Sequence, residues 1–158
     1  MPWYIRIGFR AERWFSPDWL PAGEVPGDAV KDFNSIKDCE LSVYVVHTED
    51  EGVRAATAIA ARRYQDKAVG YALFDRDATN ALGIRTEQTA GESADPVVNT
   101  WHRDLKNLTF AQLAAIARLI KTENRILDIP VPAFKTRLST GVTAGQIDRK
   151  LVEPKNLQ

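Results

Sequence analysis

The chain has 158 residues, of which 44% are hydrophobic and 27% are charged, proportions typical of a globular protein. Its 21 basic and 21 acidic residues cancel, so no overall field attracts nucleic acid or an anionic membrane. Cys39 is the single cysteine, which excludes an intramolecular disulfide and a cysteine-based zinc site within one chain. With no signal-peptide core and no apolar run of about 18 residues, we expect a soluble cytoplasmic chain that retains Met1.

Three segments of the N-terminal half have the pattern of β-strands. Residues 3–10 alternate between apolar and polar side chains, and residues 41–47 are rich in β-branched and aromatic side chains. Residues 67–74 form a second apolar run, and apolar residues at helical spacing predict a helix over 50–65. Strand, helix and strand in this order predict a βαβ crossover, with the two strands parallel and the helix on one sheet face.

The sequence after Gly83 predicts a mainly helical part. Residues 96–105 form a short helix opened by proline, and Thr109 with Gln112 has capping-box spacing before a helix over 110–122. Pro132 opens another helix that Gly141 can stop. We therefore predict a single globular domain of the α/β or α+β class, with a small mixed sheet in residues 1–90 and helices in residues 96–158.

The stretch YALFDRDATN, residues 71–80, places Asp75, Asp77 and Thr79 directly after an apolar run. This order resembles the first motif of the haloacid dehalogenase-like phosphatases, in which the first aspartate attacks phosphorus and the second handles the leaving-group proton. The resemblance implies a magnesium-dependent phosphatase or phosphotransferase with Asp75 as nucleophile. Ala78 stands where the family has glycine. The alternative, which we favour, is that Asp75 or Asp77 caps a short helix.

The stretch LSTGVTAGQIDRKL, residues 138–151, resembles the turn and second helix of a helix-turn-helix. The resemblance implies DNA binding, with Arg137, Arg149 and Lys150 near phosphates. Because the net charge is zero, these few side chains would have to supply the attraction, and we expect no binding above the non-specific level. The simpler interpretation is two short helices joined by Gly141.

The two histidines are interpreted as structural. His47 lies at a junction whose acidic residues suit the start of the helix at 50–65. His102 is next to Asp104 and is expected to form a hydrogen bond within the short helix at 96–105. No metal site and no cofactor are therefore predicted, and only the phosphatase alternative requires magnesium.

Aromatic residues are dense near the start of the chain, and two interpretations of them are open. Trp14, Phe15 and Trp19 fall outside the alternating strand and close to Arg10 and Arg13. Tryptophan and arginine are typical of protein-binding hot spots, because each buries a large area and carries a directional polar group. The alternative, which we favour for these rings, is that they fold back to cover the sheet edge or one of its faces.

No complete catalytic constellation is present in the sequence. We therefore expect a non-catalytic protein-interaction module, an accessory subunit of a prokaryotic-type complex, whose partner is another protein. The sequence leaves a homo-oligomer open.

Overall fold

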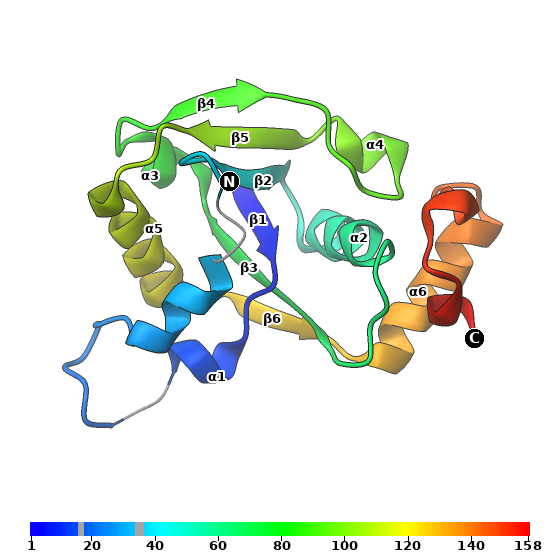
Figure 1. Ribbon diagram of the computed structural model, residues 1–158, viewed down its shortest axis with the longest axis horizontal. Helices are drawn as coiled ribbons and strands as arrows, with labels where there is room; N and C mark the ends of the chain where they lie inside the picture. The colour runs from blue at the N-terminus through cyan, green and yellow to red at the C-terminus, as the bar shows by residue number, and fades with distance from the viewer. Residues whose placement is uncertain (16–17, 34–36) are drawn as a thin grey trace.

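The computed structural model describes residues 1–15, 18–33 and 37–158. In these residues six strands form one sheet with the order β4-β5-β2-β1-β3-β6 (Figure 1). The strands are β1 (Trp3–Ile7), β2 (Leu41–Val46), β3 (Val69–Asp75), β4 (Arg85–Gln88), β5 (His102–Lys106) and β6 (Ile126–Ile129). The predicted fold class is confirmed, and the three predicted strands are present as β1, β2 and β3. Within the described residues, no helix is long and apolar enough to cross a membrane.

The helix α2 (Glu49–Ala60) connects β2 to β3 and packs on one face of the sheet. β2 and β3 run in the same direction but are not paired, because β1 lies between them and is antiparallel to both. The sheet is therefore antiparallel in every pairing between neighbouring strands, whereas the sequence predicted a mixed sheet. Thr48 caps α2 by accepting a hydrogen bond from the backbone N–H of Glu51.

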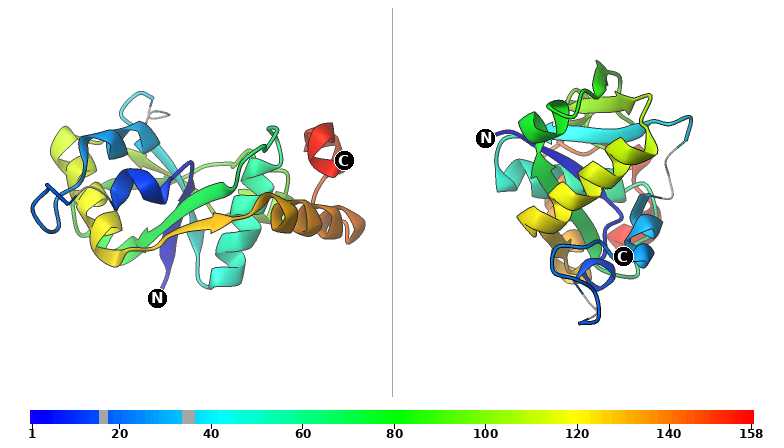
Figure 2. Two further views of the ribbon diagram at one scale, coloured as in Figure 1. Left: turned by 90° about the horizontal axis from the view of Figure 1, so that it is seen from below. Right: turned by 90° about the vertical axis from the view of Figure 1, so that its left-hand side faces the viewer.

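The sheet separates two hydrophobic clusters. Alternation along β1 sends Ile5 into the cluster beneath α2 and Tyr4 into the cluster on the opposite face. That second cluster is covered by α5 (Phe110–Glu123), α1 (Ala11–Trp14) and the 3₁₀ helix η1 (Gly27–Phe33). In Figure 2, α1 and η1 lie beside α5 at one end of the sheet, and α6 (Val131–Thr143) lies at the other end with the C-terminus.

The C-terminal part contains strands as well as helices. β5 and β6 extend the sheet on its two sides, and the predicted helix over 96–105 ends early, as α4 (Pro96–Asn99). Pairing of β5 with both β2 and β4 supplies backbone hydrogen bonds that a local helical preference cannot match. α5 does begin with the predicted capping box of Thr109 and Gln112.

The prediction of two short helices joined by Gly141 is wrong. α6 continues through Gly141 to Thr143, and only the 3₁₀ turns η2 (Arg149–Leu151) and η3 (Pro154–Leu157) follow it. A Cβ atom at Gly141 would lie 2.8 Å from Cδ1 of Ile147. Glycine here therefore permits close approach of the returning chain and does not end the helix.

Candidate functional site

An open groove of about 740 Å³ lies on the α2 side of the sheet, over β2 and β5. The end of α2 and the residues after it line the groove together with residues 89–92, which follow β4. β1 and β2 pair only at the start of β1, from Trp3 to Ile5. Further along, the guanidinium of Arg6 joins the two strands by donating a hydrogen bond to the carbonyl oxygen of Ser42 at 2.7 Å.

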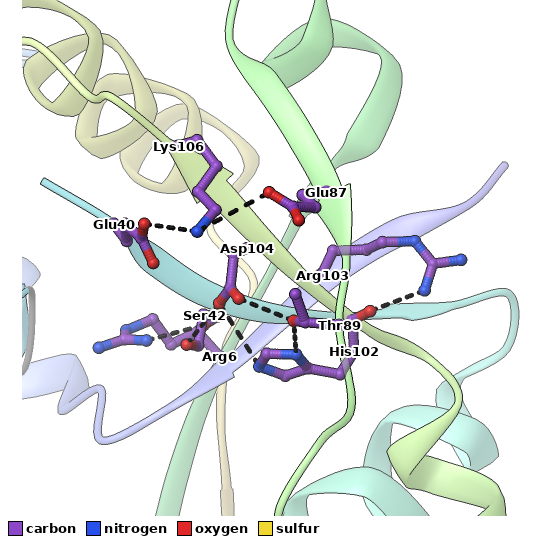
Figure 3. A network of polar contacts seen from close by, with 9 residues as sticks. All are labelled: Arg6, Glu40, Ser42, Glu87, Thr89, His102, Arg103, Asp104 and Lys106. Atoms are coloured by element: carbon purple, nitrogen blue, oxygen red, sulfur yellow. Dashed lines mark hydrogen bonds and ion pairs between the residues drawn. The ribbon is translucent and has the colours of Figure 1, made fainter. Parts of the chain in front are cut away.

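Asp104 is the centre of a polar network on the groove floor (Figure 3). Register places Ser42 of β2 directly opposite Asp104 of β5. The hydroxyl of Ser42 donates to Oδ1 of Asp104 at 2.9 Å, and the hydroxyl of Thr89 donates to Oδ2 at 2.7 Å. Two hydroxyl donors thus fix the Asp104 carboxylate, whose side chain is 14% exposed.

The same network selects a tautomer for His102. Nδ1 of His102 lies 2.7 Å from the hydroxyl oxygen of Thr89. The single hydroxyl proton of Thr89 is donated to Asp104, so the proton between Thr89 and His102 must belong to Nδ1. Neutral His102 therefore carries its free lone pair on Nε2, which lies 3.7 Å from Oδ1 of Asp104. Nε2 is the atom at which His102 can accept a proton or a hydrogen bond.

The electrostatic surroundings keep His102 neutral and Asp104 ionised at neutral pH. Burial lowers the pKa of His102, and the neighbouring Asp104 carboxylate only partly opposes this effect. Burial acts to raise the pKa of Asp104, but the hydrogen bonds from Thr89 and Ser42 outweigh it, so that pKa lies below its ordinary value. The ring of Tyr44 packs edge-on against the imidazole, with centroids 4.9 Å apart.

Arginine side chains add positive charge along the groove. Arg6, Arg62 and Arg63 all line it. Burial lowers the pKa of Arg6 to about 10, which leaves this guanidinium charged at neutral pH. Arg62 donates to the carbonyl oxygen of Glu92 at 2.6 Å and lies 3.5 Å from the Glu92 carboxylate. These contacts connect the end of α2 to the segment after β4 that contains Glu92.

Asp75, the candidate nucleophile of the phosphatase alternative, is a helix cap in the structure. Its Oδ1 accepts the backbone N–H of Ala78 at 2.7 Å at the start of α3 (Arg76–Asn80). Asp77 pairs with the neighbouring Arg76 at 3.0 Å, and buried Thr79 donates its hydroxyl to the Asp75 carbonyl at 2.7 Å. In the described part of the chain, no group of three or more His, Cys, Asp or Glu side chains is placed to hold a metal ion.

The predicted partner-binding residues divide into a buried base and an exposed surface. Trp14 is fully buried, and its indole N–H donates to Oδ2 of Asp32 at 2.7 Å. Arg13 pairs with Oδ1 of Asp32 at 2.6 Å, and the backbone N–H of Arg10 donates to Oδ2 at 3.1 Å. Asp32, in η1, is 5% exposed. Its bonds to Arg10, Arg13 and Trp14 hold α1 against η1.

Phe15 and Trp19 form the exposed part, which we call the aromatic surface. Trp19 is 78% exposed and Phe15 is 40% exposed. The ammonium group of Lys121 in α5 lies 4.6 Å from the centre of the Phe15 ring and also donates to the carbonyl oxygen of Trp14. Residues 18–26, which contain Trp19, project from the body of the molecule, whereas positions 16 and 17 lie outside the described residues (Figures 1 and 2).

The residues of the helix-turn-helix alternative do not form that motif. Arg137 is on α6, whereas Arg149 and Lys150 belong to the three-residue turn η2. All are exposed, but the segment that should enter the DNA groove as a helix is not helical. The DNA-binding alternative therefore lacks its recognition helix.

Sequence reasoning missed Ser42 and Thr89 and placed His102 and Asp104 on a helix. The useful signal was the spacing of His102 and Asp104, since residues two apart on a strand share a face. Nothing in the local sequence indicates that Ser42 and Thr89 converge on them, because those contacts depend on strand pairing. Asp32, which lies 18 positions after Trp14, was missed for the same reason.

No protein-family model matches this chain, and neither does any curated protein or solved structure.

Proposed function

We propose that this chain is a non-catalytic protein-interaction module, a subunit of a cytoplasmic complex that binds its partner through the aromatic surface. The observation that carries the proposal is Trp19, which is 78% exposed on a projecting segment. Burying an indole in a partner's pocket removes roughly 200 Å² from water and contributes on the order of several kcal/mol. The isolated chain does not gain this free energy, whereas a complex can.

The base of the projecting segment supports a binding role. Asp32 joins the backbone of Arg10 and the side chains of Arg13 and Trp14, so the elements on both sides of the segment are fixed. A fixed base reduces the conformational entropy that is lost when Trp19 docks. The segment therefore presents an aromatic anchor from a rigid support.

The charges around the aromatic surface indicate the chemistry of the partner. Lys121 lies over Phe15, and Arg10 is exposed beside α1. We expect a partner protein with an apolar pocket for the indole and carboxylates near its rim. Asp75 has no role in this proposal, because its carboxylate serves as a helix cap.

The test compares Trp19→Ala with Phe110→Ala. Phe110 is a matched control because it is 85% exposed but lies at the start of α5, eleven residues before Lys121, or about 16 Å along the helix. Proteins retained by the wild-type chain are purified, and their affinities for the wild type and for each variant are measured by calorimetry. We expect a loss of at least about 30-fold for Trp19→Ala and no change for Phe110→Ala. Sedimentation of each variant alone tests a second copy of the chain as the partner.

Equal partner affinity for the wild type and Trp19→Ala would contradict the proposal. A large drop in the melting temperature of Trp19→Ala would also contradict it, because the ring would then be part of the core.

A further inference from the structure

The groove over β2 and β5 lies apart from the aromatic surface, and several of the charged side chains that line it form ion pairs. Arg62 is paired with Glu92, and Glu40 is paired with Lys106 at 2.5 Å. The exposed guanidinium of Arg63 forms no hydrogen bond or ion pair with the residues that the structure describes. It lines a space of about 740 Å³, which is large enough for a small organic molecule.

A second recognition element lies on the floor of the same groove. Nε2 of His102 has a free lone pair because Nδ1 donates to Thr89, whose own proton goes to Asp104 (Figure 3). An atom with a lone pair accepts a hydrogen bond from a hydroxyl or amine of a ligand. Arg6 and His102 flank the paired residues Ser42 and Asp104. The guanidinium of Arg6 contacts the Ser42 carbonyl, and the imidazole of His102 faces Asp104.

We propose that this groove binds a small organic anion, whose anionic oxygens are held by Arg63 with the added positive charge of Arg6, and whose hydroxyl or amine donates to Nε2 of His102. The Arg63 side chain gives affinity for carboxylate or phosphate oxygens. The His102 lone pair gives preference for a ligand with a neighbouring donor. Arg63 and His102 both line this groove.

Binding is coupled to protonation of His102. The groups that face this imidazole are Asp104 and Arg103 on β5, Tyr44 on β2, and Thr89 and Glu92 after β4. Burial holds the pKa of His102 down, and a ligand hydroxyl that donates to Nε2 requires the neutral imidazole, so it lowers that pKa further. A ligand that lowers the pKa of His102 must, by linkage, bind more tightly as the pH rises. An anion that has no donor instead favours the imidazolium form and raises the pKa of His102.

The experiment is a proton NMR titration of the two histidines. His47 and His102 are the only histidines of the chain, so His47 serves as an internal reference. The probes are sulfate, glycolate and acetate, each compared with chloride at equal ionic strength between about pH 5.5 and 8, the range in which histidine titrates. We expect glycolate to lower the pKa of His102 and sulfate, which has no donor, to raise it, each in a saturable way and without a matching change in the His47 signals. Acetate, which lacks the hydroxyl of glycolate, should bind more weakly than glycolate.

The two stronger probes also distinguish the ligand class. Tighter binding of sulfate assigns the groove to tetrahedral phosphate-type groups, and tighter binding of glycolate assigns it to hydroxy acids. Equal shifts of His47 and His102 with every probe would overturn the proposal, because they would show general screening.

Arg63→Gln is the matching variant, because its exposed side chain can change without disturbing the core. We expect it to weaken glycolate and sulfate binding about two- to fivefold, as for an exposed ion pair. Arg149→Gln, on the exposed turn η2 and outside the groove lining, should leave binding unchanged. Wild-type affinity in Arg63→Gln would overturn the assignment of the anion site.

Discussion

Asp32 and Asp104 each accept hydrogen bonds from side chains of other elements, but they do so in different surroundings. Asp32 is 5% exposed between α1 and η1, where its donors include the buried indole of Trp14. Asp104 lines an open groove, where its donors are the hydroxyls of Ser42 and Thr89. The Asp32 network is closed off from water, so we expect it to contribute mainly to stability. The Asp104 network borders the groove, where its groups can meet the ligand that we propose.

Asp32→Ala should give the largest effect, because it removes the acceptor for Arg13 and for the indole N–H of Trp14. The Arg13 side chain is 31% exposed and can be solvated, whereas the buried indole N–H of Trp14 is left without an acceptor, which costs about 1–3 kcal/mol. We expect the free energy of unfolding, measured by denaturant titration, to fall by about 2–3 kcal/mol. A change below about 1 kcal/mol would show that these donors find water or other acceptors.

Asp104→Ala, the same substitution in the groove, should cost less, at about 1 kcal/mol. The hydroxyls of Ser42 and Thr89 can turn toward water, because the groove is open. We also expect the pKa of His102, followed by NMR, to fall further, since the Asp104 carboxylate raises it. A loss of stability equal to that of Asp32→Ala would remove the distinction between the two networks.

The free energy of unfolding should fall as the pH drops below about 7. Protonation of His102 is one cause of this fall. Burial holds the pKa of folded His102 below its ordinary value of 6.5, so the unfolded chain binds more protons between the two values. The free energy of unfolding therefore rises with pH across this window. His102→Gln should reduce that slope, as measured by thermal melts at a series of pH values. An unchanged slope in His102→Gln would mean that His102 is solvated as in the unfolded chain.

Asp75→Asn should give the smallest effect, a loss of about 1 kcal/mol or less, because asparagine also caps helices. The Asp75 carboxylate accepts the N–H of Ala78 at the start of α3 and has no part in either network. Denaturant titration measures the change, and His102 NMR with glycolate serves as the functional control. A magnesium-dependent phosphatase activity that disappears in this variant would return Asp75 to the role of nucleophile.

Local signals in the sequence predicted much of the fold. Alternation predicted β1, and apolar runs predicted β2 and β3. The cap expected at Asp75 or Asp77 is formed by Asp75, and the capping box of Thr109 is present, because both follow from short-range hydrogen bonding. These features depend on residues only a few positions apart.

Features that depend on distant pairing were not predictable. β5 contains one buried apolar side chain, Leu105, and β4 contains none, so neither has the signal of a half-buried strand. Composition could not separate Trp14 from Trp19 either. The acceptor that buries Trp14 is Asp32, which lies far along the chain, and Trp19 has no comparable neighbour in the described contacts.

The contrast between these two tryptophans gives the most direct test of the proposed interaction surface. Hydroxyl-radical footprinting, carried out on the purified chain and in intact cells, reports the oxidation of each indole by mass spectrometry. We expect Trp19 to be oxidised in the purified chain and protected in cells, and Trp14 to be protected in both. Oxidation of Trp19 to the same extent in cells as in the purified chain, with Trp14 protected throughout, would contradict the proposal that a partner covers the aromatic surface.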